Sequence, residues 1–134
     1  MKLEGSPTEH ALRQAFRDEA EMAARLGYFA RRADVDGYAA LASTLRALAE
    51  GELAHAYGHL EFLEEVDGDA DTAASVAALT DQKRQASTVD YPGRASTARA
   101  DGFADAADWF DSVTAAEGLH VVELSRAIDR LKEG

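Results

Sequence analysis

The chain has 134 residues and a formal net charge of -11, and it contains 29 alanines, two prolines and no cysteine. Alanine has the highest helix propensity and the residues that fill sheets are scarce, so a mostly β fold is excluded. Without cysteine the chain can form no disulfide or iron–sulfur cluster, and any bound metal must use histidine and carboxylates. The negative charge argues against nucleic acid and anionic membranes as partners.

The length fits a single domain over residues 1–134. No apolar run approaches a membrane span, and the first residues, Met1-Lys2-Leu3-Glu4-Gly5, lack the apolar core of a signal peptide. We therefore expect a cytoplasmic protein that contacts no membrane.

Apolar periodicity predicts four helices, over residues 7–33, 36–65, 73–100 and 102–132. The first opens at a capping box with proline in its first turn, Ser6-Pro7-Thr8-Glu9, and Asp36 is expected to cap the second. Pro92 lies inside the third helix, where we expect it to bend the helix rather than end it.

The acidic loop between the second and third helices has part of a calcium-site pattern. Asp67, Asp69 and Asp71 have the first three spacings of an EF-hand loop, but Thr72 replaces the required glycine and Ala78 the bidentate glutamate. Helix capping explains these aspartates better than calcium binding does.

An internal repeat relates the second and fourth helices at an offset of 65 residues. The matched pairs are Gly37 with Gly102, Tyr38 with Phe103, Leu45 with Phe110, Leu48 with Val113, Glu52 with Glu117 and His55 with His120. The domain is therefore predicted to consist of two helical hairpins that carry the same polar pair.

Each Glu-x-x-His pair places a carboxylate and an imidazole one turn apart on the apolar stripe of its helix. Glu19 lies on the corresponding stripe of the first helix, between Phe16 and Met22. A single such pair would more often be a hydrogen-bonded core group. Two matching pairs with a third inward carboxylate favour a metal site, because buried charges must be compensated.

With these residues in place, the chain resembles the rubrerythrin family over nearly its whole length. Ferritin-like di-iron bundles take one glutamate from each of two helices and Glu-x-x-His from each of the other two. The resemblance rests on Ala15-Phe16-Arg17-Asp18-Glu19, Tyr28-Phe29-Ala30, Glu52-Leu53-Ala54-His55-Ala56, Tyr91-Pro92, Gly102-Phe103 and Ala116-Glu117-Gly118-Leu119-His120.

The resemblance implies an all-α, ferritin-like four-helix bundle with a non-haem metal centre that reduces hydrogen peroxide or oxidises ferrous iron. It implies iron, as one or two ions per site, although nitrogen and oxygen ligands also suit manganese and zinc. Carried over to this chain, the implied ligands are Glu19 at a terminal position, the bridging carboxylates Glu52 and Glu117, and the nitrogen ligands His55 and His120. His59 and Tyr28 are candidates to surround the ligands, and His59 could also be an extra ligand or a proton shuttle.

The third helix departs from the family pattern. The family places glutamates about eight and five residues before the Tyr-Pro pair, where this chain has Lys83 and Ala86. In one interpretation Lys83 fills or neutralises the second metal position and leaves one ion near Glu19, Glu52 and His55, or a weak second one. In the other, Lys83 reaches solvent and water completes a normal metal pair.

The loop between the hairpins bears on assembly. A ferritin-like connection runs the length of the bundle, and the residues between Glu65 and Ala74 could span it only when almost fully extended. We therefore expect a homodimer in which two chains exchange hairpins, as is known in this family. The sequence has no cysteine-rich rubredoxin module, so an enzyme would need a separate electron donor. The rival interpretation is a non-catalytic or single-metal structural dimer that has lost its third-helix ligands.

Overall fold

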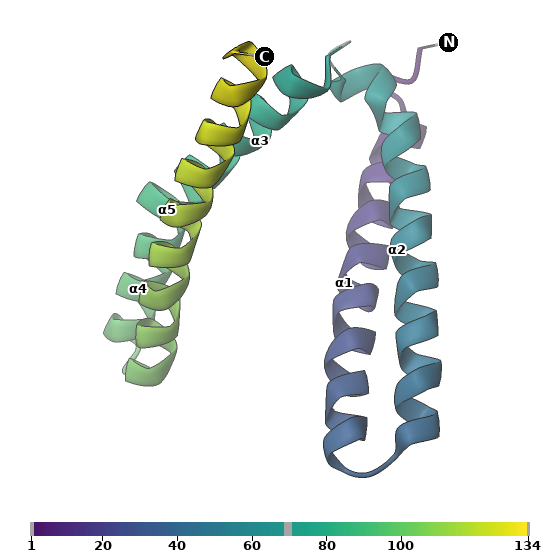
Figure 1. The fold of residues 1–134 in the computed structure, drawn as a ribbon, viewed down its shortest axis with the longest axis vertical. Coiled ribbons are helices and arrows are strands. Elements are labelled where there is room, and N and C mark those ends of the chain that lie inside the picture. The colour runs from purple at the N-terminus through teal and green to yellow at the C-terminus, as the bar shows by residue number, and fades with distance from the viewer. Residues whose placement is uncertain (1, 69–70, 134) are drawn as a thin grey trace. The chain divides into compact units, whose positions relative to one another are not determined.

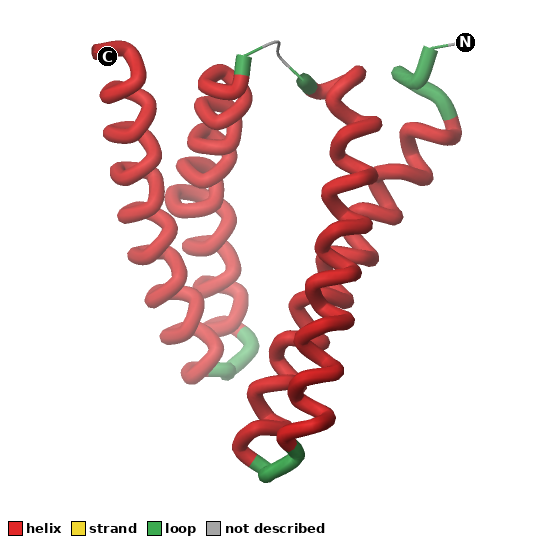
Figure 2. Tube along the Cα trace, turned by 45° about the vertical axis from the view of Figure 1, so that its right-hand side comes forward, coloured by secondary structure: helices red, strands yellow, loops and turns green. Residues whose placement is uncertain are grey.

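The computed structural model describes residues 2–68 and 71–133, and the described residues are helical apart from short turns and caps. The elements are α1 (Pro7–Val35), α2 (Ala39–Asp67), α3 (Thr72–Gln85), the π-helix η1 (Ala86–Asp90), α4 (Tyr91–Ala100) and α5 (Ala104–Glu133). No strand occurs among these residues (Figure 2). The predicted all-α class is confirmed, and the four predicted helices occur with ends shifted by at most three residues.

The chain divides into two compact units, Met1–Gly68 and Asp69–Gly134. In the first unit α1 packs along α2, and in the second α3 and α4 pack along α5 (Figure 1). We call them the first and the second hairpin. Across residues 2–68 and 71–133, no helix combines the length and apolar character needed to cross a bilayer.

The two hairpin turns have the same backbone geometry. Gly37 and Gly102 each have φ of +86°, a left-handed conformation that glycine adopts without a steric penalty. In each turn the amide after the glycine donates to a carbonyl five residues back, from Tyr38 to Ala33 and from Phe103 to Ala98, both at 2.8 Å. The repeat seen in the sequence is therefore also a repeat of turn structure.

The expectation that Asp36 caps the second helix is wrong. Asp36 is the C-cap of α1, where its amide donates to the carbonyls of Arg32 and Asp34. The turn at Gly37 follows, and α2 begins at Ala39 without a side-chain cap. The left-handed turn separates Asp36 from the amides of α2 that it would have to accept from.

Alanines fill the interior of both hairpins. They show that the 65-residue repeat also includes the helices that precede the two turns. At the same offset of 65, three pairs of alanines have nearly equal exposure in the two hairpins. They are Ala30 and Ala95 at 1%, Ala33 and Ala98 at 5% and 7%, and Ala42 and Ala107 at 0%. Small side chains allow helix backbones to approach closely, so alanine sets the helix spacing in each hairpin.

Many large apolar side chains of the helices and turns are 45–68% exposed. They are Met22, Phe29, Leu41, Leu48, Phe62, Phe103 and Leu131, whereas Leu63 is buried. A two-helix hairpin has one contact line, and side chains beside that line stay open. Each hairpin thus presents apolar surface that its own helices do not cover.

The predicted capping box of α1 and the cap at Asp71 are confirmed. The Ser6 hydroxyl accepts from the Glu9 amide at 3.0 Å, and the Glu9 carboxylate accepts from the amide of Gly5 at 3.0 Å. Asp71 caps α3 by accepting from the Ala73 amide at 2.8 Å.

Of the other loop aspartates, Asp67 accepts two hydrogen bonds from Arg13, at 2.7 and 2.9 Å, which tie the end of α2 to the start of α1. The Arg13 guanidinium lowers the pKa of the Asp67 carboxyl. Asp69 lies outside the described residues. Capping and pairing therefore account for Asp71 and Asp67.

The third helical stretch passes through Pro92 after a widened turn. The Tyr91 amide donates to the carbonyl of Ala86, five residues back, in the π-helix η1. A π turn accommodates one residue more than an α turn, and proline cannot donate to the preceding turn. The helix therefore continues from Thr72 to Ala100 with one inserted residue just before Pro92.

Candidate metal centre

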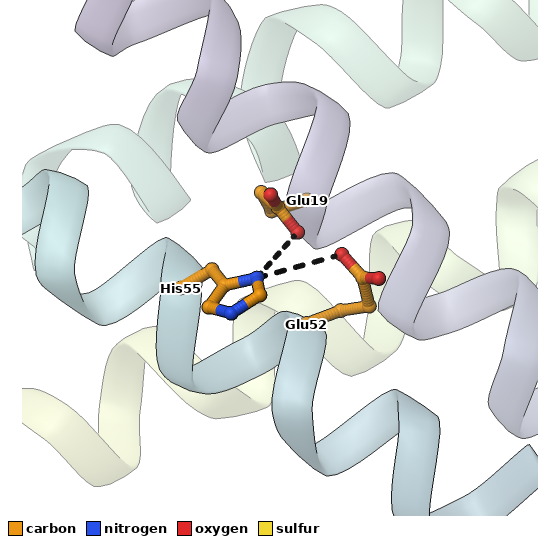
Figure 3. A group of neighbouring side chains, drawn as sticks. All are labelled: Glu19, Glu52 and His55. Carbon is orange, nitrogen blue, oxygen red and sulfur yellow. Dashed lines mark ion pairs between the residues drawn. The ribbon is translucent and has the colours of Figure 1, made fainter.

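The first hairpin brings together Glu19, Glu52 and His55. Each offers one ligand atom, and these three atoms lie within 4.8 Å of one another. The His55 Nδ1 atom is 3.5 Å from Glu19 Oε2 and 4.0 Å from Glu52 Oε2 (Figure 3). Glu52 and His55 are one turn apart on α2, and Glu19 reaches them from α1.

The charge of this cluster is not balanced by hydrogen bonds. Glu19 Oε2 is buried and has no hydrogen-bond partner among the described residues. The side chains of Glu19 and Glu52 are 25% and 30% exposed, so two formal negative charges lie close together in a half-buried place. An uncompensated buried oxygen is costly, and a bound cation would remove that cost.

The second hairpin holds the matching pair in a different setting. His120 Nδ1 is 4.0 Å from Glu117 Oε1, the same separation as in the pair on α2. Here, however, the Lys83 ammonium group donates to Glu117 Oε2 at 2.6 Å. The Glu117 side chain is 18% exposed and that of Lys83 is 37% exposed. Glu117 thus has a cationic partner from the neighbouring helix, and Lys83 is bound to it rather than extended into solvent.

Lys83 occupies the place in the second hairpin that Glu19 occupies in the first. Ala30 matches Ala95 at an offset of 65, but the π turn adds one residue between Lys83 and Ala95. Upstream of that turn the offset becomes 64, which pairs Glu19 with Lys83. The sequence comparison missed this equivalence because a constant offset pairs Glu19 with Arg84 instead.

His59 and Tyr28, the two residues expected next to the metal ligands, differ in burial. The Nε2 atom of His59 is buried and has no hydrogen-bond partner among the described residues, and His59 is not one of the three clustered residues. Tyr28 is 56% exposed, and its ring packs edge-on against Phe29 with centroids 5.3 Å apart. Of the two, His59 has the buried, unsatisfied nitrogen.

The donor set decides which hairpin fits an iron ion. Two carboxylates and one imidazole are ligands that suit iron, and Glu19, Glu52 and His55 fit it in both chemistry and charge. Glu117 and His120 supply similar donors, but Lys83 already neutralises the carboxylate. As folded here, the second hairpin does not fit a second ion.

Comparisons with known proteins agree with the sequence resemblance. The family model described as Rubrerythrin matches residues 10–128. A protein named Rubrerythrin from Nitratidesulfovibrio vulgaris is 30% identical over 142 residues, covering 98% of this chain and 74% of the relative. Another of that name from Porphyromonas gingivalis is 30% identical over 128 residues, covering 88% of this chain and 64% of the relative.

Proposed function

Since the chain belongs to the rubrerythrin family, which implies a ferritin-like di-iron protein, we propose that it is an iron-dependent oxidoreductase whose substrate is hydrogen peroxide or ferrous iron. The observation that carries the proposal is the cluster of Glu19, Glu52 and His55, with ligand atoms within 4.8 Å of one another. The family implies iron, so the proposal is for iron and not for manganese or zinc.

In this proposal the residues of the first hairpin bind and position the metal. The carboxylates of Glu19 and Glu52 and the imidazole of His55 would hold it, and iron bound there would supply one-electron redox chemistry. The α1–α2 contact fixes Glu19 against the other two side chains. The Arg13–Asp67 hydrogen bonds hold the open end of the same hairpin together. Reduction of peroxide to water consumes two electrons and two protons, so the reaction also needs an electron donor.

We further propose that two chains exchange hairpins to complete the bundle. Asp67 ends α2 about 22 Å beyond Glu52, and Thr72 begins α3 about 16 Å before Lys83. In a ferritin-like bundle the connection crosses the length of the molecule, here nearly 40 Å, by adding these two distances. The link from Asp67 to Thr72 reaches at most about 19 Å. The exposed apolar side chains of each hairpin would then be covered by a hairpin of a second copy.

Light scattering tests the exchange. The expected mass is that of a dimer, and a 14.4 kDa monomer would contradict the exchange. Inserting about thirty glycine and serine residues between Gly68 and Asp71 gives a flexible link of roughly 30 Å, with ample extended reach. This insertion is expected to produce monomers with unchanged helix content.

Activity of the iron-loaded protein tests the oxidoreductase proposal. Consumption of hydrogen peroxide with an added reductant, and oxidation of ferrous iron in air, are measured for the wild type and for Glu52→Ala. The matched control is Glu50→Ala, which removes an exposed carboxylate from the same helix. We expect activity in the wild type and the control, and loss of at least tenfold in Glu52→Ala because a ligand is removed.

A second candidate is a non-catalytic metal-binding dimer, and the Lys83–Glu117 ion pair is the observation that favours it. If the wild type binds iron but neither reaction exceeds that of Glu52→Ala, this second candidate replaces the first.

A further inference from the structure

The two hairpins present opposite charges at equivalent positions beside their Glu-x-x-His pairs. In the first hairpin Glu19 stands across from Glu52 and His55. In the second, the position shifted by the π turn is Lys83, across from Glu117 and His120. The local Glu–His separation is 4.0 Å in both hairpins, so the difference lies in the residue from the neighbouring helix.

We infer that the Lys83 ammonium group takes the place of a second metal ion, so that each chain binds one iron ion, through Glu19, Glu52 and His55. This inference rests on the iron-binding part of the proposed function, and it departs from the two ions that family membership implies. Lys83 then has a role of its own, as the cation that satisfies Glu117.

Charge compensation supports the assignment. The first cluster has two carboxylates and a buried oxygen, Glu19 Oε2, without a hydrogen-bond partner among the described residues, so it needs a cation. The Lys83–Glu117 pair is formally neutral and already makes a hydrogen bond of 2.6 Å. A divalent ion beside Glu117 would have to displace Lys83 or be repelled by it. Because Lys83 already neutralises the Glu117 carboxylate, that carboxylate would attract a second cation only weakly.

The setting of the pair distinguishes it from the ordinary surface ion pairs of the chain. Arg25 and Glu21 pair at 3.3 Å within one helix, and their side chains are 67% and 69% exposed. Lys83 and Glu117 belong to different helices, lie closer together and are 37% and 18% exposed. Removing one partner of such a half-buried pair leaves the other charge uncompensated, so a change at Lys83 should alter what Glu117 binds.

The test is the number of iron ions bound per chain. The full chain is titrated anaerobically with ferrous iron, free iron is removed by gel filtration, and bound iron is measured by mass spectrometry. The wild type is expected to bind one equivalent. Lys83→Glu gives the second hairpin the same three residue types as the first, and it is expected to bind two. Lys132→Glu is the matched control, since it makes the same charge change at an exposed position and should still bind one.

Two further variants keep Lys83 and locate the bound ion, in case Lys83→Glu does not fold. Glu52→Gln is expected to bind no iron, and its repeat equivalent Glu117→Gln is expected to bind one equivalent. Circular dichroism verifies that each variant retains its helix content. Loss of iron from Glu117→Gln as complete as from Glu52→Gln would overturn the inference.

The remaining outcomes separate failure of this inference from failure of the proposed function. Two equivalents in the wild type, or one equivalent in a folded Lys83→Glu variant, would show that Lys83 does not replace an ion. No bound iron in the wild type would refute the proposed iron protein itself, and this inference with it.

Discussion

The first hairpin and the second hairpin share their turns, their alanine contacts and their Glu-x-x-His pairs, yet they differ at one cross-helix position. Glu19 leaves the first pair with excess negative charge, whereas Lys83 leaves the second neutral. One helix scaffold can therefore carry a candidate metal cluster or a salt bridge, according to the sign of a single side chain. The repeat also reverses an ion pair near the turns: Asp34 binds Arg46 in the first hairpin, and Arg99 binds Asp111 in the second.

The substitution Glu19→Lys gives the first hairpin the charge of the second. Glu19→Lys places an ammonium group beside Glu52 and is expected to weaken iron binding by roughly 100-fold or more, since even residues that only support ligands affect affinity by 10–100-fold. Equilibrium dialysis with ferrous iron measures the change. Asp18→Lys, an exposed neighbour on α1, is the control and should keep wild-type affinity. Wild-type affinity in Glu19→Lys would refute the role of Glu19.

The alanine contacts test whether the two hairpins are equivalent in packing. Ala42→Leu and Ala107→Leu each place a larger side chain at a position with 0% exposure, and each is expected to lower the free energy of unfolding by about 1–3 kcal/mol. Urea denaturation followed by circular dichroism measures both. Ala40→Leu, at an exposed position of α2, should change stability little. A cost in only one hairpin would show that the repeat is not a repeat of packing.

Changes to the Asp34–Arg46 ion pair should alter the free energy of unfolding by less. Asp34→Arg alone places two cations together and is expected to lower the free energy of unfolding by up to about 1 kcal/mol, because the pair is half-exposed. Adding Arg46→Asp gives the first hairpin the charge order of the second. The double variant should therefore regain the free energy of unfolding that Asp34→Arg loses. A double-mutant cycle measures the coupling, and zero coupling would mean that the pair contributes nothing to stability.

The smallest expected change in stability concerns the Arg13–Asp67 salt bridge of the first hairpin. Arg13 lowers the pKa of Asp67, so the salt bridge stabilises the fold above the pH at which an unfolded aspartate protonates, near 4, and is lost as the pH falls through the lower folded pKa. Asp67→Asn should therefore be slightly less stable than the wild type at neutral pH. The difference should disappear once the pH is low enough to protonate Asp67 in the folded state as well. Thermal unfolding across this range checks the prediction, and a difference independent of pH would contradict it.

The sequence predicted the helices because their signals are local. The Ser6–Glu9 capping box, the glycine at each turn and the apolar periodicity each act over a few residues. The Glu-x-x-His pairs could be found in the same way, since a helix places both side chains one turn apart.

What the sequence did not predict depends on contacts between helices. The π turn at residues 86–90 shifts Lys83 by one residue, so the constant offset of the repeat hid its equivalence to Glu19. Sequence spacing did not decide what the Lys83 ammonium group contacts, because a long flexible side chain can reach a carboxylate or solvent. The exposure of large side chains such as Phe62 and Phe103 was also missed. Periodicity identifies an apolar face but does not show what covers it.

We propose that each chain binds one iron ion, in the first hairpin. A crystal of the iron-loaded protein, measured at the iron absorption edge, tests it directly by anomalous scattering. We expect one anomalous peak per chain, bonded to Glu19, Glu52 and His55, with Lys83 still paired with Glu117. A second peak of comparable height bonded to Glu117 and His120 would contradict it.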